Sequence, residues 1–399
     1  MRIAAFTPYL PYPPDEGGKI RSYHLLQALA AHSDMDLYTV YYGKRPSQAA
    51  IEAVREHYHR VVLFHLEKPR RTRDRIRRIL ASLPRSVEHF HTAHSLQQAR
   101  RHLENGQYDL VIADEIHMTP YAELALDTAR IVSRQKVDHV HFREMAKARP
   151  WGLEKVLDHI EAAQLQQYER AKMPFYQACV VCSQHDATLV RRDAPGIPVV
   201  VIPNGADLTA FIPSGRPRAR VPTLLYVGSM HYYPNIDAVR FFFEETYGLI
   251  QQDAPGVRVQ IVGHGPTPET QQLGHLPHVE VTGTVPDVRP YYEQASVFIV
   301  PLRLGGGTRL KIVEAMAMGL PVVSTTVGAE GLDVHPGEDI LIADDAATFA
   351  RSVLKLLSNP DLRDSIAKGG RLLARRYDWQ ELAKPYIDLV ETVVREWKQ

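Results

Sequence analysis

The chain has 399 residues, of which 45% are hydrophobic and 23% charged, and its formal net charge at pH 7 is +1. This length can supply two domains with separate cores, the composition is that of an ordinary globular protein, and the balanced charge argues against a nucleic-acid-binding protein. No segment approaches the ~18 apolar residues of a membrane span, and prolines interrupt residues 1–14, which argues against a signal peptide. We therefore expect a cytoplasmic protein.

The first half of the chain alternates short apolar segments with segments of helical character. Because strands that alternate with helices form doubly wound parallel sheets, we expect a Rossmann-like domain with ligands at the carboxyl ends of its strands. The segments predicted as strands are residues 2–8, 35–42, 60–66, 110–115, 129–136 and 178–183.

Two turns of this domain carry candidate ligand-binding residues. Gly17 and Gly18 follow the first strand and lead into an amphipathic helix, with Lys19 and Arg21 just beyond. A third glycine at the dinucleotide-binding spacing is missing, so this is not a nicotinamide-type fingerprint. The alternative is a plain turn that requires glycine.

Acidic and histidine side chains follow two further strands. Asp114, Glu115 and His117 come after one predicted strand, and Asp138 and His139 after the next. Their position predicts contact with a ligand at the carboxyl edge of the sheet. A solvated loop is an equal alternative for each residue taken singly, and the sequence does not name a general base.

The two cysteines, Cys179 and Cys182, form a C-x-x-C inside an apolar segment. Residues three apart on a strand point to opposite faces, so neither a shared metal nor an easy disulfide follows. We expect both thiols to be buried and structural.

Residues 68–85 form the most basic segment, with eight Lys or Arg and one Asp. Ile76, Ile79, Leu80 and Leu83 recur at helical spacing, which predicts a basic amphipathic helix of the kind that lies on anionic membranes. Each basic residue near such a surface adds about 1 kcal/mol. The alternative is a solvated helix that packs through its narrow apolar stripe.

The second half of the chain repeats the alternation of strands and helices. Two Rossmann-like domains in series are therefore expected, residues 1–197 completed by a C-terminal helix at 380–399, and residues 198–379, with an active site in a cleft between them. The predicted strands are residues 199–202, 223–230, 257–263, 279–285, 296–302, 321–326 and 339–343.

The segment 296–324 is the most informative part of the sequence. An apolar strand ends at Leu302 and is followed by Gly305, Gly306 and Gly307, which deliver the chain to a helix beginning near Thr308. Glycines allow close backbone approach, and the free N–H groups of a helix N-terminus attract anions. This arrangement predicts an anion-binding site.

Charged residues of the following helix support this interpretation. Arg309 and Lys311 place two cations where the helix is already partly positive, so a bound anion, most simply a phosphate, is expected. Glu314 shares one helical stripe with Lys311 and could hold a pair of hydroxyls. The alternative is a simple Lys311–Glu314 ion pair, worth only about 0.5 kcal/mol.

Segment 296–324 resembles the signature of nucleotide-sugar glycosyltransferases of the GT-B fold, specifically the retaining family 4 (group 1). That signature has two glutamates eight positions apart. Glu314 matches the second, which in this family holds the nucleotide ribose, whereas Gly306 stands where the first would be. The identity of the sugar is therefore not carried over from the family.

The usual Arg and Lys after the first strand of the second domain are also replaced. Ser229 stands at the Arg position and Pro234 near the Lys position. We infer that Arg309 and Lys311 supply the phosphate-binding charge instead. The missing Asp-x-Asp pair implies that no metal takes part.

The resemblance extends over nearly the whole chain and assigns roles to other turns. Pro203, Asn204, Gly205 and Asp207 match the start of the family's second domain, and Trp379 precedes the last helix. The resemblance implies that the nucleotide base binds at Gly263, His264 and Val285, and that the donor phosphates bind at Gly305, Gly306, Gly307, Thr308, Gly17 and Gly18. It implies that the acceptor binds near Lys19, Arg21, Asp114, Glu115, His117 and Asp138. Glu330 either caps the donor site or is a turn carboxylate.

The implied activity is transfer of a hexosyl or N-acetylhexosaminyl group from a UDP- or GDP-sugar, with retention and without a metal or other cofactor. The acceptor would be a hydroxyl of a saccharide or lipid-linked saccharide in cell-surface polysaccharide or glycoconjugate biosynthesis, with residues 68–85 on the inner face of the plasma membrane. The first alternative is a catalytically idle nucleotide-sugar-binding subunit, because of Gly306. The second is a nicotinamide or flavin oxidoreductase, which the missing G-x-G-x-x-G turns disfavour.

Overall fold

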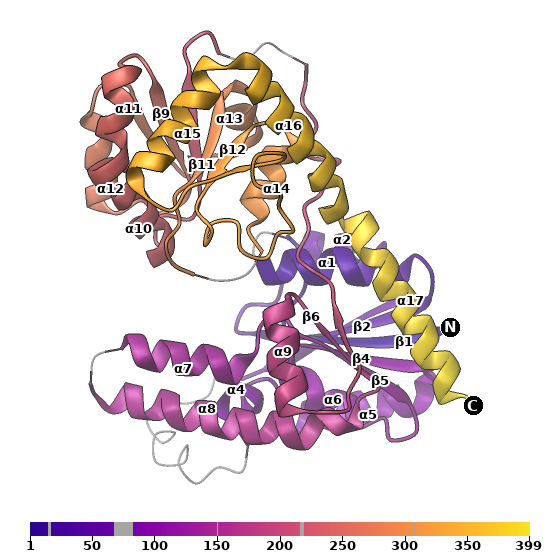
Figure 1. Ribbon diagram of the computed structural model, residues 1–399. Coiled ribbons are helices and arrows are strands. Elements are labelled where there is room, and N and C mark those ends of the chain that lie inside the picture. Colours follow the sequence, from indigo (N-terminus) through magenta and orange to yellow (C-terminus); the bar gives the residue numbers. More distant parts are fainter. Residues whose placement is uncertain (15–16, 68–82, 150, 216–218, 306–307) are drawn as a thin grey trace. The chain divides into compact units, whose positions relative to one another are not determined.

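The computed structural model describes residues 1–14, 17–67, 83–149, 151–215, 219–305 and 308–399, and it divides into two compact units (Figure 1). The first unit comprises Met1–Pro203 together with Leu382–Gln399, and the second unit comprises Asn204–Glu381. The expected boundaries, after residues 197 and 379, fall slightly earlier in the chain than these.

The first unit is built on a parallel sheet in the order β3-β2-β1-β4-β5-β6-β7. Every residue of β4, β5 and β6 is buried, which explains why these strands read as continuous apolar runs. The strands are β1 (Arg2–Thr7), β2 (Asp34–Tyr42), β3 (Arg60–Leu66), β4 (Leu110–Asp114), β5 (Ala129–Ser133), β6 (Ala178–Val181) and β7 (Val199–Val201).

Strand β7 belongs to the first unit, whereas the second domain was expected to begin at residue 198 and so to include this strand. Val199–Val201 pairs in parallel with β6 and so belongs to the first sheet. Three consecutive valines fit the interior of either sheet equally well, so the apolar pattern alone could not assign them.

Helices connect the strands of the first unit, and the α7–α8 pair forms a hairpin that extends away from the sheet (Figure 1). Helix α5 begins with a capping box in which the Thr92 and Ser95 side chains each accept from the other's backbone N–H. The helices are α1 (Gly17–Ala30), α2 (Gln48–Arg55), α4 (Arg85–Glu88), α5 (Ala93–Gly106), α6 (Thr119–Ala122), α7 (Asp138–Ala148), α8 (Leu153–Lys172) and α9 (Gln184–Asp193), with 3₁₀ turns at Ile116–Met118 and Met173–Phe175.

The second unit contains a parallel sheet in the order β10-β9-β8-β11-β12-β13. Its core is formed by the apolar residues of these strands and of the helices on both faces. The strands are β8 (Thr223–Val227), β9 (Arg258–Val262), β10 (Val279–Gly283), β11 (Val297–Val300), β12 (Val322–Ser324) and β13 (Leu341–Ile342). Two doubly wound, Rossmann-like units therefore confirm the expected fold class.

The helices of the second unit occupy the connections between these strands. A single π-helical turn, Phe242–Thr246, joins α10 to α11. The helices are α10 (Tyr233–Phe241), α11 (Tyr247–Asp253), α12 (Pro268–Gln272), α13 (Arg289–Gln294), α14 (Leu310–Ala317), α15 (Ala346–Ser358) and α16 (Pro360–Ala374), with 3₁₀ turns at Leu273–His275 and Arg375–Tyr377.

The last helix, α17 (Trp379–Trp397), returns the chain to the first unit. Leu382, Tyr386 and Val390 are buried along one face. Proline usually interrupts a helix, but Pro385 lies inside a continuous one. The buried amphipathic face evidently outweighs the lost backbone hydrogen bond.

None of the helices in the described parts of the chain combines the length and the apolar character needed to cross a bilayer. Of the basic segment 68–85, residues 68–82 lie outside the described residues, so the predicted amphipathic helix there stays a prediction.

Candidate active site

The loops that follow β8 and β9 lie against each other at the carboxyl edge of the second sheet. The Gly228 amide donates to the Val262 carbonyl at 2.9 Å, and the Met230 amide donates to the His264 carbonyl at 2.7 Å. Gly263 has φ +152°, and a Cβ there would lie 1.8 Å from the Gly228 carbonyl oxygen. The close approach of the two loops therefore requires glycine at this position.

Lys311 lies in the first turn of α14 and is buried among neutral groups. Its Nζ donates to Asn235 Oδ1 at 3.1 Å and lies 4.7 Å from the centre of the Tyr226 ring. Burial, reinforced by the positive charge of Arg309, lowers the pKa of Lys311 to about 7. The Tyr226 hydroxyl donates to the same Asn235 oxygen at 2.8 Å, which fixes the orientation of the amide.

Glu314, one turn later on α14, has a different partner. Its carboxylate accepts a hydrogen bond of 3.0 Å from the Tyr292 hydroxyl. Burial raises the pKa of Glu314, while this hydrogen bond and the charge of Lys311 oppose the shift. Lys311 and Glu314 thus contact different side chains rather than forming the simple ion pair considered as the alternative.

Arg309 and Thr308 bring further donors to the start of α14. Arg309 is the residue that precedes the helix, and burial lowers the pKa of its guanidinium, with Glu330 opposing the shift. The buried Thr308 hydroxyl has no hydrogen-bond partner among the described residues. Buried donors beside a helix N-terminus are suited to bind an anion.

The glycine turn before α14 is described only in part. Gly305 has φ +93°, a left-handed conformation that favours glycine, and a Cβ there would lie 3.3 Å from Arg309 Nη2. Gly306 and Gly307 lie outside the described residues, so the phosphate-binding role expected for them stays a prediction.

The residues expected near a nucleotide base lie on neighbouring loops of the same edge. His264, after β9, shares a hydrogen bond of 2.8 Å with Thr284 Oγ1, after β10. Its ring lies 5.5 Å from that of His231, edge to face. Val285 is half-buried against the core of the second unit.

The first unit places Asp114 and Glu115 at the carboxyl end of β4. The Ser22 hydroxyl donates to the buried Asp114 carboxylate, and burial raises the pKa of Asp114 to about 6. Glu115 has φ +88°, and burial together with the charges of Asp138 and Asp114 raises its pKa well above the usual range. Such clustered, shifted carboxyls are typical of functional sites.

Gly17 and Gly18 form the first residues of α1 rather than a turn ahead of it. Gln135 Nε2 donates to the Gly18 carbonyl and to Tyr9 Oη, both at 3.0 Å. A Cβ on Gly18 would lie 2.4 Å from the same Tyr9 oxygen. This packing gives Gly18 a structural reason to be glycine, whatever else it does.

The two cations expected beside this turn differ in their environments. Arg21 is 1% exposed, and its Nη1 donates to the carbonyls of Ile202 and Pro203 at 2.7 and 3.3 Å. Lys19 is half-buried. Arg21 thus anchors the backbone that follows β7.

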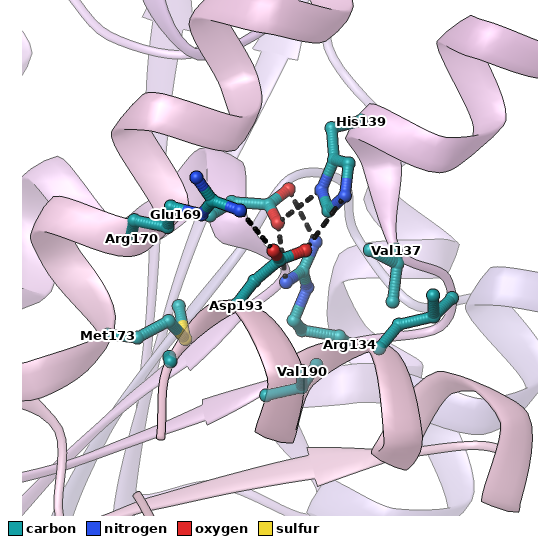
Figure 2. A pocket seen from close by; sticks show the side chains of 10 residues that line it. Arg134, Val137, His139, Glu169, Arg170, Met173, Val190 and Asp193 are labelled. Carbon is teal, nitrogen blue, oxygen red and sulfur yellow. Dashed lines mark hydrogen bonds and ion pairs between the residues drawn. The ribbon is translucent and has the colours of Figure 1, made fainter. Parts of the chain in front are cut away.

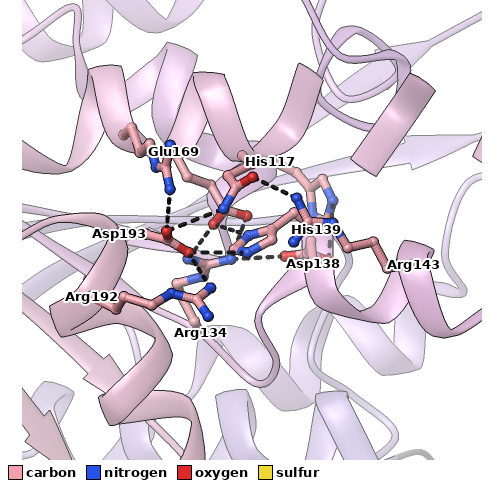
Figure 3. Close-up of polar contacts among 10 residues, drawn as sticks. His117, Arg134, Asp138, His139, Arg143, Glu169, Arg192 and Asp193 are labelled. Carbon is pink, nitrogen blue, oxygen red and sulfur yellow. Dashed lines mark hydrogen bonds and ion pairs between the residues drawn. The ribbon is translucent and has the colours of Figure 1, made fainter. Parts of the chain in front are cut away.

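His117 and Asp138 meet above the sheet, with His117 Nε2 3.8 Å from Asp138 Oδ1 (Figure 3). Burial lowers the pKa of His117, although Asp138 opposes the shift. Asp138 in turn lies 3.4 Å from the buried guanidinium of Arg134. His117 and Asp138, two of the residues expected near the acceptor, are therefore joined to a buried network of charged side chains.

That network surrounds a small cavity of about 10 Å³ between α7, α8 and α9 (Figure 2). His139 Nδ1 lies 2.8 Å from Glu169 and its Nε2 3.1 Å from Asp193. Arg134 contacts Glu169 at 2.7 Å, and the charge of Arg134 is the main cause that holds the Glu169 pKa below its usual range against burial.

No cluster of three or more His, Cys, Asp or Glu suited to a metal ion occurs in the described parts of the chain. Cys179 and Cys182 are both buried and are not joined in a disulfide, and burial raises the pKa of each thiol. The burial of both thiols is as expected from the sequence.

Sequence reasoning missed the neutral partners of the α14 site. Tyr226 belongs to a strand that was interpreted only as core, and Tyr292 to a short helix that drew no attention. Asn235 stands in the segment after Gly228 that was searched only for cations. None of these three residues lies near Lys311 or Glu314 in the sequence, so local spacing gave no signal for such partners.

Two parallel-sheet units and a cationic helix N-terminus beside a buried glutamate form the arrangement expected of a glycosyltransferase of the GT-B fold. The family profile "Glycosyl transferases group 1" matches residues 221–359, and "Glycosyltransferase Family 4" matches residues 47–210. The chain belongs to this family, the group 1 glycosyltransferases of family 4.

Curated relatives agree with this assignment. The chain is 31% identical over 222 residues to phosphatidyl-myo-inositol mannosyltransferase of Mycobacterium tuberculosis, a match that covers 51% of this chain and 58% of the relative. It is 21% identical over 379 residues to an uncharacterized 44.6 kDa protein in the cps region of Klebsiella pneumoniae, covering 90% and 91%.

Solved structures share the fold over the whole length. Sucrose-phosphate synthase from Thermosynechococcus elongatus has a TM-score of 0.69 at 19% identity, covering 99% of this chain and 100% of that one. Anabaena HepE in complex with UDP-glucose has a TM-score of 0.65 at 14% identity, covering 98% and 100%. WaaG, a glycosyltransferase involved in lipopolysaccharide biosynthesis, has a TM-score of 0.63 at 15% identity, covering 97% and 99%.

Proposed function

We propose that the protein transfers a hexosyl or N-acetylhexosaminyl group from a UDP- or GDP-sugar to a hydroxyl of a saccharide or lipid-linked saccharide, with retention and without a metal. The observation that carries this proposal is the buried Lys311 ammonium, which hydrogen-bonds neutral groups at the start of α14 beside Arg309. A buried cation whose hydrogen bonds go to neutral groups is suited to accept an anionic ligand.

In the proposed reaction, the bond between the anomeric carbon of the donor and its phosphate oxygen breaks, and a bond to the acceptor oxygen forms on the same face. The leaving diphosphate takes the acceptor proton. Arg309 and Lys311 stabilise the negative charge that develops on the leaving oxygen, and α14 contributes its N-terminal amides. Glu314, held by Tyr292, binds the ribose hydroxyls of the nucleotide.

The acceptor is proposed to bind the first unit near Asp114, Glu115, His117 and Asp138. The raised pKa values of the two carboxyls after β4 support a ligand-binding role for that edge. Polysaccharide or glycoconjugate assembly at the cytoplasmic face of the membrane is proposed because WaaG is involved in lipopolysaccharide biosynthesis and the Klebsiella relative is a protein in a cps region.

The donor site is tested first by thermal shift with UDP, GDP, ADP, dTDP and their sugar conjugates, without added metal. A ligand at about 100 times its dissociation constant stabilises the fold by about 2.7 kcal/mol, which raises Tm by a few degrees. We expect a selective response to one of the uridine or guanosine diphosphates. A folded sample that responds to none of the panel would contradict the proposed donor site.

The catalytic role of Arg309 is tested by turnover of the Arg309→Ala variant. Removal of one well-placed donor typically costs about 100- to 1000-fold in kcat, and we expect a loss of this size with an unchanged fold. Arg303→Ala is the matched control, because Arg303 precedes the same helix but is paired with Asp237 at 2.9 Å. Turnover of Arg309→Ala at the wild-type rate would contradict the assignment.

A nucleotide-sugar-binding subunit without activity is the second candidate function. The glycine at position 306, where the family signature has a carboxylate, is the observation that favours it. This candidate predicts the same selective thermal shift but no transfer or hydrolysis of the sugar with any acceptor offered. Measured turnover of the wild-type protein would exclude it.

A further inference from the structure

The tip of the α7–α8 hairpin exposes a group of large apolar side chains. Trp151 is 89% exposed, Leu153 55% and Val156 45%. Leu153 and Val156 are three residues apart on α8 and so lie on one side of the helix, with Trp151 just before its first turn. Single exposed apolar residues are common, but a contiguous group rimmed by charges marks an interaction surface.

The hairpin itself explains why these side chains have no cover within the first unit. Leu157, one turn after Leu153, is buried against the rest of the unit, as is Ala162 further along α8. Leu153 and Val156 belong to the first turn of α8, which begins shortly after α7 ends at Ala148, so they lie at the open end of the hairpin. The end of α7 and the start of α8 lie at the far end of the hairpin from the sheet (Figure 1).

Cations surround the apolar tip. Lys147, Arg149 and Lys155 lie within residues 147–155 together with Glu154, and Arg149 Nε forms an ion pair of 2.9 Å with Asp158 of α8, so Lys147 and Lys155 supply the excess positive charge at the tip. Lys155 Nζ lies 5.1 Å from the centre of the Trp151 ring and donates to the Arg149 carbonyl at 3.1 Å. A tryptophan with an adjacent lysine is suited to the boundary between acyl chains and anionic headgroups, where the ring is partly desolvated and the ammonium meets phosphate.

We infer that the hairpin tip formed by Lys147, Arg149, Trp151, Leu153, Lys155 and Val156 is a contact site for an anionic lipid bilayer. This site is separate from the basic segment 68–85 and goes beyond the proposed transfer reaction. Helix α7 begins at Asp138 and has 11 residues, so its length places the tip roughly 16 Å from the proposed acceptor-binding edge. Interfacial insertion of the tip would bring that edge near the headgroups.

The experiment is co-sedimentation of the full-length protein, without substrate, with vesicles of phosphatidylcholine alone or with about one third phosphatidylglycerol. We expect binding to the anionic vesicles, and at least roughly tenfold weaker binding of Trp151→Ser/Leu153→Ser/Val156→Ser. This variant keeps every basic residue of 68–85. Leu126→Ser/Phe175→Ser is the matched control, since both side chains are exposed, at 74% and 55%, on connections that enter β5 and β6.

Trp151 also reports directly on insertion. Of the three tryptophans, Trp379 is buried and Trp397 is 41% exposed, so a Trp397→Phe protein leaves Trp151 as the exposed fluorophore. We expect its emission to shift to shorter wavelength on anionic vesicles and to be quenched by brominated acyl chains.

Three results would overturn the inference. Unshifted Trp151 emission on bound vesicles would place the membrane contact elsewhere in the chain. Equal vesicle binding by the tip variant and the wild type would do the same. A wild-type dimer that becomes monomeric in the tip variant, with no vesicle binding, would show that a second copy of the chain covers the tip.

Discussion

Neutral side chains surround the Lys311 ammonium, and this choice of partners decides how the group responds to pH. The Asn235 amide and the Tyr226 ring stabilise a positive charge less than a carboxylate would. Burial therefore lowers the pKa of Lys311 to about 7. In an unfolded chain the lysine pKa is about 10.4.

The difference between the folded and unfolded pKa values of Lys311 predicts how the free energy of unfolding changes with pH. Between pH of about 7 and about 10, the unfolded chain holds a proton on this lysine that the folded chain has released. The contribution of Lys311 to the free energy of unfolding should therefore increase as the pH rises through this window and stay constant below it. Chemical denaturation of the wild type and of Lys311→Met across the window measures the difference, which would be flat if the lysine stayed charged when folded.

Nucleotide binding should show the opposite trend. A diphosphate favours the protonated lysine, so the affinity for the responding nucleotide should fall as the pH is raised above about 7, by up to about tenfold per unit. Titration calorimetry in two buffers of different ionisation enthalpy should detect proton uptake on binding. Lys311→Arg is the control, because a guanidinium stays charged throughout and its profile should be flat. A wild-type profile that is equally flat would show that Lys311 is already protonated before the ligand binds.

The proposed donor site illustrates how far single residues could be predicted. Gly305, Arg309, Lys311 and Glu314 were expected at one helix terminus because their order along the chain already places them there. Tyr226 and Tyr292 could not be expected, since they come from distant segments and a tyrosine in an apolar strand has the pattern of ordinary core. Contacts between segments depend on tertiary packing that local spacing does not encode.

Among the secondary-structure elements, α7, α8 and α9 are tied together by buried charges rather than by apolar contacts alone. Glu169 of α8 faces Arg134 and His139, and Asp193 at the end of α9 faces His139 from the other side (Figure 2). Because buried charges are tolerated only when they are paired, loss of one member leaves the others uncompensated.

Substitution of Glu169 should therefore be costly. We expect Glu169→Gln to lower the free energy of unfolding by about 3–5 kcal/mol, because it leaves the Arg134 guanidinium without its main countercharge. Glu154→Gln, on the exposed first turn of the same helix, should change it by less than about 0.5 kcal/mol. Urea denaturation compares the two, and equal small effects would show that the network contributes little.

The same network predicts that the free energy of unfolding falls at acid pH. Hydrogen bonds from Arg192 and Arg170, with the charges of His139 and Arg192, hold the pKa of Asp193 at about 2 against burial, and the pKa of Glu169 is also below its usual range. Lowered carboxyl pKa values stabilise the fold above the unfolded value near 4, and this contribution is lost as the pH falls from about 4 towards 2.

The alternation of strands and helices was predictable because parallel strands buried on both faces leave continuous apolar runs. The assignment of β7 and the continuity of α17 were not, for different reasons. Three valines fit either sheet, and the effect of Pro385 depends on how strongly its neighbours Tyr386 and Leu382 are buried. Local rules mark where an element can end, whereas packing decides whether it does.

The chain as a whole begins and ends in the same unit, and the second unit is inserted between residues 203 and 382. Tyr386 and Val390 of α17 are 1% and 0% exposed. The first unit therefore depends on residues that lie far from the rest of it in sequence.

Substitution in α17 should consequently affect one unit selectively. We expect Tyr386→Ala to destabilise the first unit by about 3–5 kcal/mol through the cavity that it leaves. Hydrogen exchange read by mass spectrometry should show lost protection within residues 1–203 while residues 204–381 stay protected. Glu391→Ala, on the exposed side of the same helix, is the control. Equal loss of protection in both units would show instead that they unfold together.

This insertion also dictates an order of events during synthesis. A ribosome releases residues 204–381 before it releases the segment from Leu382 onward, which supplies Tyr386 and Val390. The second unit can therefore close its core while the first, although started earlier, still lacks a buried side of its own. The unit that is translated first is the last that can be completed, and the apolar surface that α17 covers stays open until that helix is released.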